Sequence, residues 1–284
     1  MSESHQLSSA EIAKRAKSNL AIALSCLPKE RREDMISFYA FCRIADDIAD
    51  NLETPADEKK RQLDELRKIV TNGEAVGNPV LDEVVQLSPK YGFPRAWLGE
   101  IVDGVATDLD QVRYETLDDL LAYCYKVACV VGLVSIEIFG HRHPDTKNYA
   151  VNLGYALQIT NIMRDVGEDA AEGGRIYLPL EDLERFGVTE KEILEGRHSD
   201  RFVRLMDAQY GRAKQFYQQA SESLPTVDKP FMLPSEMMAK IYSEILHKLK
   251  RTGYPVFSGR CRLHPMRKAA ILTTYMLRGW IARF

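Results

Sequence analysis

The sequence has little cysteine, glycine and proline, and no excess of either charge. Its 284 residues include 5 cysteines, 17 glycines and 12 prolines, and 38 Lys and Arg stand against 41 Asp and Glu. The cysteines show no Cys-x-x-Cys pair and no Cys/His spacing typical of zinc sites, so we expect reduced, mostly buried thiols. The few, scattered glycines and prolines favour long elements over a many-turned β architecture. A net charge of −3 gives no reason to expect nucleic-acid binding.

A targeting or membrane-spanning segment is also lacking. The first residues do not show the basic-then-apolar pattern of a signal peptide. The longest uncharged run, Asn148 to Met163, is shorter than the roughly 20 apolar residues of a spanning helix, and it contains several amides. We therefore expect a cytoplasmic protein that is soluble or, at most, peripheral to a membrane.

What the sequence does have is a helical pattern of apolar residues nearly throughout. We expect a first helix that Ser8–Glu11 caps and Pro28 ends. We expect further helices over residues 30–51, 57–72, 79–88, 94–111, 116–139, 144–170, 180–186, 189–195, 199–223, 230–252 and 265–283. Residues 175–179 read as an extended connector, because Pro179 biases the residue before it away from helix. No repeat, low-complexity stretch or long linker divides the chain, so the prediction is one all-α domain over residues 1–284.

Two acidic clusters depart from ordinary helix chemistry. Asp46 and Asp50 are four residues apart near the end of one predicted helix, and Asp165 and Asp169 repeat this near the end of another. Like charges at this spacing destabilise an isolated helix, and the C-terminal end of a helix disfavours anions. Either cluster alone could be a solvated acidic face with ordinary surface pairs. Two such pairs on long apolar helices of one domain indicate a shared function.

Carboxylates in this pattern suit magnesium and diphosphate. Mg²⁺ prefers a few carboxylates, several waters and phosphate oxygens to a closed protein cage. Two facing pairs beside an apolar cavity would bind a diphosphate through its metal ions and leave the attached hydrocarbon in the cavity. This arrangement suits the ionisation of an allylic diphosphate, because the metals stabilise the leaving group and a dry pocket protects the carbocation.

At the level of motifs, the sequence resembles the squalene/phytoene synthase family of head-to-head prenyl transferases. The resemblance covers nearly the whole chain. It rests on the two aspartate-rich segments, the Tyr-Cys-Tyr-x-Val-Ala segment and the connector after the second aspartate-rich segment: Phe38–Asp50, Gln158–Asp169, Tyr123–Gly132 and Gly174–Pro179. It implies an isoprenoid-synthase-type helical bundle around a central apolar cavity.

The resemblance also implies roles for individual residues. Binding of Mg²⁺ and diphosphate is implied for Asp46, Asp50, Asp165 and Asp169. Three tyrosines would line the reaction zone and stabilise charge or handle a proton: Tyr39, Tyr123 and Tyr242. Substrate contacts are implied for Arg43, Gly132, Gln158, Asn161, Arg164 and Arg260.

Each role has a plainer alternative. Without the resemblance, Tyr39 and Tyr123 would be assigned to the core, Gly132 to close helix packing and Arg260 to a solvated loop. The first helix lacks the family's aromatic, Ser-rich stretch, so Lys17 is the candidate phosphate ligand there.

The implied reaction joins two all-trans prenyl diphosphates through a cyclopropylcarbinyl diphosphate. The segment Val127–Gly132 lacks the Ala-Gly-Thr-Val-Gly of many phytoene synthases. We therefore favour two farnesyl diphosphates as the substrates, presqualene diphosphate as the intermediate, and squalene or a related C30 compound as the product. One alternative is a phytoene synthase that condenses two geranylgeranyl diphosphates. Another, of a different class, is a catalytically inactive helical subunit that retains the fold.

The implied cofactor is Mg²⁺, with Mn²⁺ as a substitute. The sequence leaves NADPH use and oligomeric state open. Peripheral membrane contact would serve release of a lipid product.

Overall fold

The structure, a computed structural model, describes residues 9, 11, 23–110 and 113–281. In these residues the chain is helical, and an isolated bridge between Arg113 and Ile176 is its one β contact. The helices are η2 (Leu24–Cys26), α3 (Lys29–Asp50), α4 (Ala56–Asn72), α5 (Pro79–Tyr91), α6 (Ala96–Thr107), α7 (Leu117–Cys124), η3 (Tyr125–Cys129), α8 (Val130–Phe139), α9 (Thr146–Ala171), α10 (Leu180–Phe186), α11 (Glu190–Leu194), α12 (Asp200–Ser223), α13 (Leu233–Arg251) and α14 (Pro265–Ile281). The predicted all-α class is confirmed. Most of the predicted first helix, Lys17 included, lies outside the described residues.

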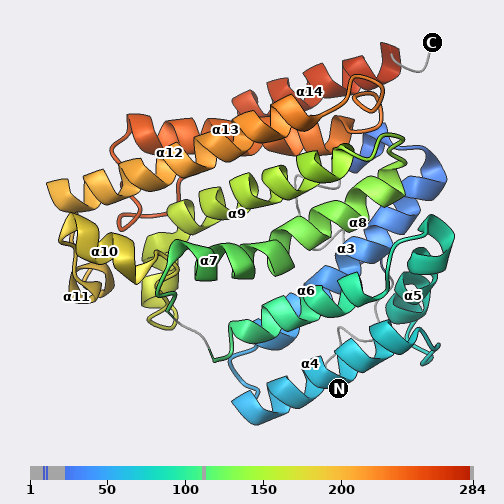
Figure 1. Ribbon diagram of the computed structural model, residues 1–284, viewed down its shortest axis with the longest axis horizontal. Coiled ribbons are helices and arrows are strands. Elements are labelled where there is room, and N and C mark those ends of the chain that lie inside the picture. The colour runs from blue at the N-terminus through green and yellow to red at the C-terminus, as the bar shows by residue number, and fades with distance from the viewer. Residues whose placement is uncertain (1–8, 10, 12–22, 111–112, 282–284) are drawn as a thin grey trace.

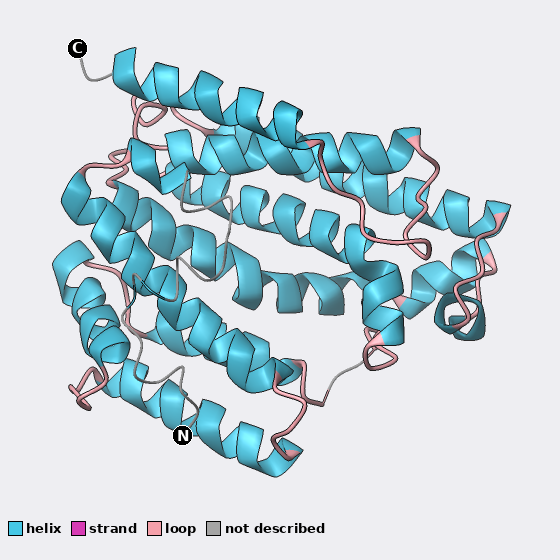
Figure 2. Cartoon of the chain, turned by 180° about the vertical axis from the view of Figure 1, so that it is seen from behind, coloured by secondary structure: helices cyan, strands magenta, loops and turns pink. Residues whose placement is uncertain are grey.

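Helix α9 is the centre of the bundle. It packs against α12, α8 and α13, as Figure 1 shows, and the view from behind shows helices joined by short loops (Figure 2). Buried apolar side chains form two clusters, and α9 contributes to both, with Leu153 in one and Ile159 in the other. This helix therefore forms the wall that the two halves of the core share.

The predicted helix 116–139 is confirmed as one continuous helical segment, Leu117–Phe139, but its middle is π-helical rather than α-helical. The chain forms α7, a π-helical segment η3 and α8 in succession. Glycines let the neighbours come close: a Cβ on Gly104 of α6 would lie 2.7 Å from Lys126 Cβ, and one on Gly154 of α9 would lie 2.6 Å from Cys129 Cα. A π-helical segment is a local rearrangement that often marks a functional site. Here it begins two residues after Tyr123.

The segment Leu117–Phe139 is, by length and composition, apolar enough to cross a membrane. Lys126 interrupts its uncharged run, so it is not the longest uncharged stretch of the chain. In the structure its α8 half packs against α9, α6 and α3, with Val130 and Val134 fully buried. This is how a core helix of a folded domain is placed.

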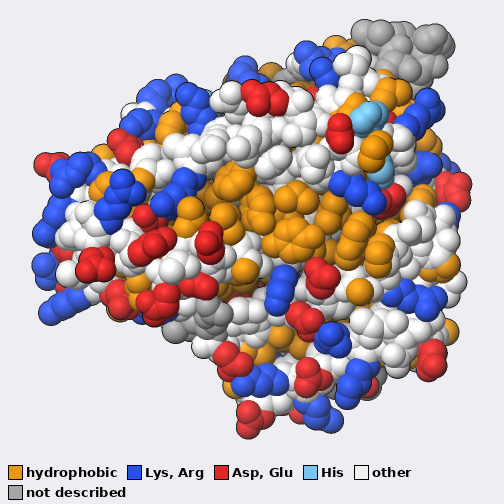
Figure 3. Space-filling model, viewed as in Figure 1, with side chains coloured by type: hydrophobic (Ala, Val, Ile, Leu, Met, Phe, Trp, Pro, Cys, Tyr) orange, Lys and Arg blue, Asp and Glu red, His pale blue; other side chains and the backbone are white. Residues whose placement is uncertain are grey.

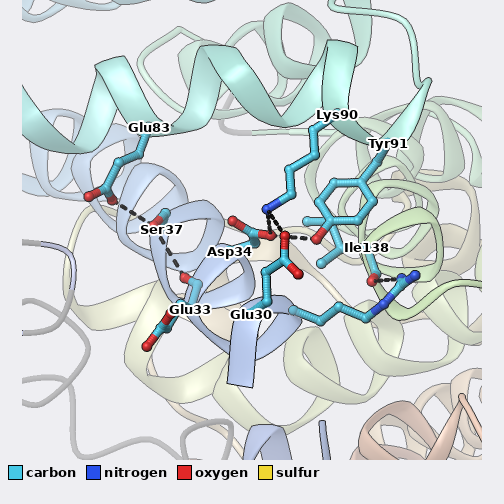
Figure 4. Close-up of polar contacts among 9 residues, drawn as sticks. Glu30, Glu33, Asp34, Ser37, Glu83, Lys90, Tyr91 and Ile138 are labelled. Carbon is cyan, nitrogen blue, oxygen red and sulfur yellow. Dashed lines mark hydrogen bonds and ion pairs between the residues drawn. The ribbon is translucent and has the colours of Figure 1, made fainter. Parts of the chain in front are cut away.

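The N-terminal half of α3 is tied to α5 and α8 by a polar network (Figure 4). Lys90 lies 2.7 Å from Asp34 and 2.8 Å from Glu30, and Tyr91 donates to Asp34. Arg31 donates to the Ile138 carbonyl at the end of α8. The network therefore fixes the N-terminal half of α3, at the opposite end of the helix from Asp46.

A buried carboxylate organises the start of α9. Asp228 is fully buried and accepts hydrogen bonds from the Arg142 and His143 amides, each at 2.9 Å, and from Thr146 Oγ1 at 2.5 Å. Burial alone would raise the pKa of Asp228, but these hydrogen bonds outweigh that effect and lower it. The turn from α8 into α9 thus depends on an ionised carboxylate.

We expect Asp228→Asn to lower the free energy of unfolding by about 1–3 kcal/mol, because one acceptor oxygen becomes a donor facing a buried donor. The pKa is lowered in the fold, so the stabilisation is complete above the ordinary value of 3.8 and is lost as the pH falls through the folded-state value. Urea unfolding at pH 7 measures the loss. Asp145→Asn, at an exposed site on the same turn, is the control and should unfold like the wild type. An unchanged Asp228→Asn midpoint would contradict this account.

Candidate active site

An apolar cavity lies inside the bundle between α3, α6, α8, α9 and α13, with a volume of about 580 Å³. Phe38, Val131 and Leu157 are among its lining residues. A second recess of about 770 Å³, here called the polar mouth, is lined mainly by charged and amide side chains. Seven residues border both spaces: Arg43, Asp46, Val105, Asp108, Tyr123, Gln158 and Asn161. The apolar cavity is therefore continuous with the polar mouth.

Every candidate residue that the structure describes borders one of these two spaces, whereas Lys17 lies outside the described residues. The apolar cavity alone has Tyr39, Gly132 and Tyr242. The polar mouth alone has Asp50, Arg164, Asp165, Asp169 and Arg260. The remaining five lie where the spaces meet: Arg43, Asp46, Tyr123, Gln158 and Asn161. The fold thus brings together two acidic segments that are more than a hundred residues apart.

The first acidic segment ends α3. Arg43 pairs with Asp47, which is exposed, and its guanidinium lies 3.6 Å from Asp46. The surface pair expected for a solvated acidic face is therefore present too. Asp50 is exposed at the last position of the helix, where no basic residue in the final turn offsets it.

The second acidic segment ends α9 and carries two arginines on one carboxylate. Arg164 donates to both oxygens of Asp165, at 2.7 and 2.5 Å, and Arg260 reaches the same carboxylate at 2.9 Å. Arg260 also lies 3.5 Å from Glu168. Asp165 is thus neutralised by protein cations, and the loop containing Arg260 is held against α9.

Gly167, in the middle of this segment, allows that loop to approach. A Cβ at this position would lie 2.3 Å from the Val256 carbonyl oxygen and 3.1 Å from Phe257 Cα. Both are backbone atoms, so the loop would have to move as a whole. The glycine of the Asp-Val-Gly-Glu-Asp run is therefore required for the position of Arg260.

Gly132 has a similar packing role. A Cβ there would lie 3.0 Å from the Ala150 carbonyl oxygen on α9, and the residue also borders the apolar cavity. Gly132 therefore allows close helix packing and leaves this part of the cavity lining without a side chain.

Two carboxylates of the mouth, Asp46 and Asp169, keep a raised pKa in spite of the arginines near them. Burial, reinforced by neighbouring carboxylates such as Asp50 and Asp165, raises the pKa of Asp46 and of Asp169 to about 7. Arg43 and Arg175 act in the opposite direction without cancelling the rise. In the part of the chain that the structure describes, Asp50 and Asp169 form no salt bridge. More positive charge is needed here than these side chains supply.

The donor set fits Mg²⁺ only as a partial site. Among the described residues, no three His, Cys, Asp or Glu side chains converge closely enough to hold a metal ion. Mg²⁺ is commonly held by one or two carboxylates, with water and substrate phosphates completing the shell. The Asn161 Oδ1 atom is buried and without a hydrogen-bond partner in the described structure, so an acceptor is left for a metal-bound water or a ligand.

Asp108, Arg175 and Tyr177 are residues of the mouth that were not predicted from the sequence. Asp108 follows α6 directly and accepts from the Tyr123 hydroxyl at 3.0 Å and the Tyr177 hydroxyl at 2.9 Å. Arg175 lies close enough to Asp108 and Asp50 to interact with both electrostatically. Arg175 and Tyr177 stand in the connector that the motif comparison had marked, whereas no spacing pattern singles out Asp108.

Comparison with known proteins bears directly on this site. The family model of squalene/phytoene synthase matches residues 13–267, nearly the whole chain. The chain belongs to the squalene/phytoene synthase family. Members of this family condense prenyl diphosphates head to head, and this chain is a prenyltransferase of that type.

Individual relatives agree with this membership. The phytoene synthase of Arthrospira platensis is 33% identical to this chain, over 98% of this chain and 94% of the relative. The phytoene synthase of Mycobacterium tuberculosis is 32% identical over 92% and 86%. A dehydrosqualene synthase structure superposes with a TM-score of 0.84 at 29% identity, covering 97% of this chain and 96% of that one. A squalene synthase structure from Alicyclobacillus acidocaldarius gives 0.76 at 25%, over 87% and 94%. The isoprenoid-synthase-type bundle is thereby confirmed.

We expect Gly167→Ala to displace Arg260 from Asp165 and so to weaken substrate binding. Overpacking of this kind costs about 1–3 kcal/mol of stability, and KM should rise towards that of Arg260→Ala. Steady-state kinetics with a prenyl diphosphate substrate measure the effect.

Gly211→Ala is the matched control, because this glycine is exposed in α12 and nothing lies within 4 Å of its missing Cβ. It should keep the wild-type KM and stability, or gain slightly from helix propensity. A Gly167→Ala enzyme with wild-type KM would show that the loop contact does not position Arg260.

Proposed function

We propose that this prenyltransferase is a Mg²⁺-dependent phytoene synthase that condenses two geranylgeranyl diphosphates. The observation that carries the proposal is the convergence of both aspartate-rich segments on the mouth of one apolar cavity. Relatives named phytoene synthase, 31–33% identical over about nine-tenths or more of this chain, support the C40 substrate over the farnesyl diphosphate that the Val127–Gly132 segment favoured. The similarity to dehydrosqualene and squalene synthase structures supports farnesyl diphosphate as the substrate instead. The product assay below distinguishes the two substrates.

The four aspartates, Asp46, Asp50, Asp165 and Asp169, are the residues that would hold Mg²⁺. When bound with a diphosphate, Mg²⁺ supplies electrostatic stabilisation of the leaving group. The carboxylates of Asp46 and Asp169 support this role, because burial beside like charges favours the arrival of a cation. Mn²⁺ is the expected substitute, since it shares the preference for oxygen ligands.

The basic and amide side chains of the mouth would bind and orient the diphosphate. Arg43, Arg164 and Arg260 place guanidinium groups around it, and guanidinium forks match phosphate oxygens well. Gln158 and Asn161 of α9 border both the polar mouth and the apolar cavity. Asn161 Nδ2 donates to Gln158 Oε1 at 3.5 Å. We assign them the orientation of phosphate or metal-bound water.

The tyrosines would serve the hydrocarbon end. Burial, with Asp108 reinforcing it, raises the pKa of Tyr123 well above its ordinary value, so this phenol keeps its proton. We therefore assign Tyr123 charge stabilisation rather than proton abstraction. Tyr39 and Tyr242 border the same cavity, and Arg164 lies over the Tyr242 ring at 5.8 Å from its centroid. The apolar walls would exclude water, which would otherwise quench the carbocation.

Peripheral contact with a membrane is part of the proposal, because both substrate and product are lipids. A patch of hydrophobic side chains covers the middle of one face of the molecule, over α8 and α9, with charged residues around it (Figure 3). We assign the protein to the cytoplasm with such contact. NADPH would be needed only for a reduced C30 product.

A product assay tests the substrate. We expect geranylgeranyl diphosphate with Mg²⁺ to give a C40 hydrocarbon, without any requirement for NADPH, and with two substrate molecules consumed per product. Mass spectrometry of the lipid extract measures this, with farnesyl diphosphate in a parallel reaction. A C30 product formed at a higher kcat/KM than the C40 product would reverse the choice of substrate. A cyclised product from one molecule would contradict head-to-head condensation.

The metal role is tested by Asp46→Asn and Asp165→Asn, which we expect to lower kcat by about 100-fold or more, as loss of a transition-state charge interaction does. Excess EDTA should abolish turnover, and added Mg²⁺ should restore it. Diphosphate release measures all three, and Asp57→Asn on the outer side of α4 is the control that should retain full activity. Undiminished release in both variants and in EDTA would contradict the proposal. An inactive wild-type protein would instead support the alternative of a helical subunit without catalytic activity.

A further inference from the structure

A cluster of three tyrosines surrounds one carboxylate where the apolar cavity meets the polar mouth. The ring centroids are 5.3 Å apart for Tyr114 and Tyr123, and 5.4 Å apart for Tyr123 and Tyr177. Those of Tyr114 and Tyr177 are 5.8 Å apart. Tyr123 and Tyr177 both donate to Asp108, one to each carboxylate oxygen. Asp108 directly follows α6, and Tyr123 lies near the end of α7 (Figure 1). Three parts of the chain are thus joined at this carboxylate.

Asp108 shares with Asp46 a position that the other three aspartates of the acidic segments do not have. It borders both the apolar cavity and the polar mouth, whereas Asp50, Asp165 and Asp169 border the mouth alone. It has no salt-bridge partner among the described residues, and its side-chain hydrogen bonds come from two phenols. Its negative charge is therefore directed towards the cavity through two neutral rings, with Arg175 near enough to interact electrostatically but not paired with the carboxylate.

The hydrogen bonds favour an ionised carboxylate. Burial raises the pKa of Asp108 above its ordinary value, and the hydrogen bonds from Tyr177 and Tyr123, with the nearby Arg175, limit that rise. A phenol that donates to an anion gains electron density on its ring, and an electron-rich ring attracts a cation more strongly. The reaction assigned to this cavity forms such a cation at the boundary between hydrocarbon and diphosphate.

We propose that Asp108 is a positioning residue for this reaction, which orients Tyr123 and Tyr177 and stabilises the allylic carbocation through them. The proposal rests on the proposed function, since it requires a carbocation in the apolar cavity. Asp108 lies outside both aspartate-rich segments, so the proposal adds a functional residue to those that the motifs mark. The competing interpretation is that Asp108 only holds α6, α7 and the connector together.

Kinetics give the first test, with Asp108→Asn as the variant. The amide keeps the shape of the side chain but removes its charge and one acceptor oxygen. We expect kcat to fall by about 10- to 100-fold with KM within about 3-fold, because the interaction exists only with the cation formed. Tyr177→Phe should show a smaller fall of the same kind. Tyr114→Phe is the matched control: its hydroxyl is buried without a partner in the described structure and borders neither space, so kcat should not change.

Binding of two probes separates charge stabilisation from a structural role. One probe is a geranylgeranyl ammonium analogue of the carbocation, added with Mg²⁺ and inorganic diphosphate. The other is geranylgeranyl thiolodiphosphate, which resembles the uncharged prenyl chain of the substrate and does not ionise. Asp108→Asn should bind the ammonium analogue at least about 10-fold more weakly and the thiolodiphosphate within about 2-fold of the wild type.

The outcomes are distinguishable. Equal weakening for both probes, or none for either, in Asp108→Asn and Tyr177→Phe would overturn the role of Asp108 and leave the proposed function standing. A wild-type protein that binds neither probe would reject the proposed function and this proposal with it. Selective loss of the cationic probe in either variant supports the inference.

Discussion

The structure depends on one electrostatic constraint: several carboxylates must lie together at the mouth of an apolar cavity. Water screens them poorly in this position, and the cavity behind them offers no counter-charge. The fold offsets part of the charge with four arginines, of which Arg164 and Arg260 converge on Asp165. Asp46 and Asp169 keep a raised pKa in spite of this. A cationic ligand would neutralise the remaining negative charge.

Close backbone packing gives these charges their positions. The glycines at 104, 132, 154 and 167 each bring a helix or loop within reach of its neighbour, and a methyl group at any of them would meet another backbone or side chain at 3.0 Å or less. Three of these contacts set the spacing of α6, α8 and α9 around the apolar cavity, and the fourth sets the loop of Arg260. The polar networks around Asp228 and Asp34 fix the far ends of α9 and α3. The positions of both acidic segments therefore depend on contacts at the opposite ends of α3 and α9, because each helix is rigid along its length.

Much of this architecture was predictable because helical periodicity and motif spacing are local properties. The helix bounds agree with the predicted ranges mostly to within a few residues, and all the candidate residues that the structure describes border the two joined spaces. The π-helical segment η3 was missed because its cause is the packing of α6 and α9 against it, which no local pattern records. Asp108 was missed for a similar reason: its partners, Tyr123 and Tyr177, are 15 and 69 residues away in the chain. The farnesyl preference rested on a few residues of one helix, whereas the length of the substrate depends on the whole cavity.

The central claim is that the acidic mouth binds a divalent cation and a diphosphate together, and neither well alone. No three potential ligands converge among the described residues, so the diphosphate must supply part of the metal shell. Isothermal titration of the wild-type protein with Mg²⁺, in the presence and absence of inorganic diphosphate, tests this most directly. The account predicts Mg²⁺ binding at least about 10-fold tighter with diphosphate present, which corresponds to a coupling free energy of about 1.4 kcal/mol. Equal Mg²⁺ affinity with and without diphosphate would contradict it.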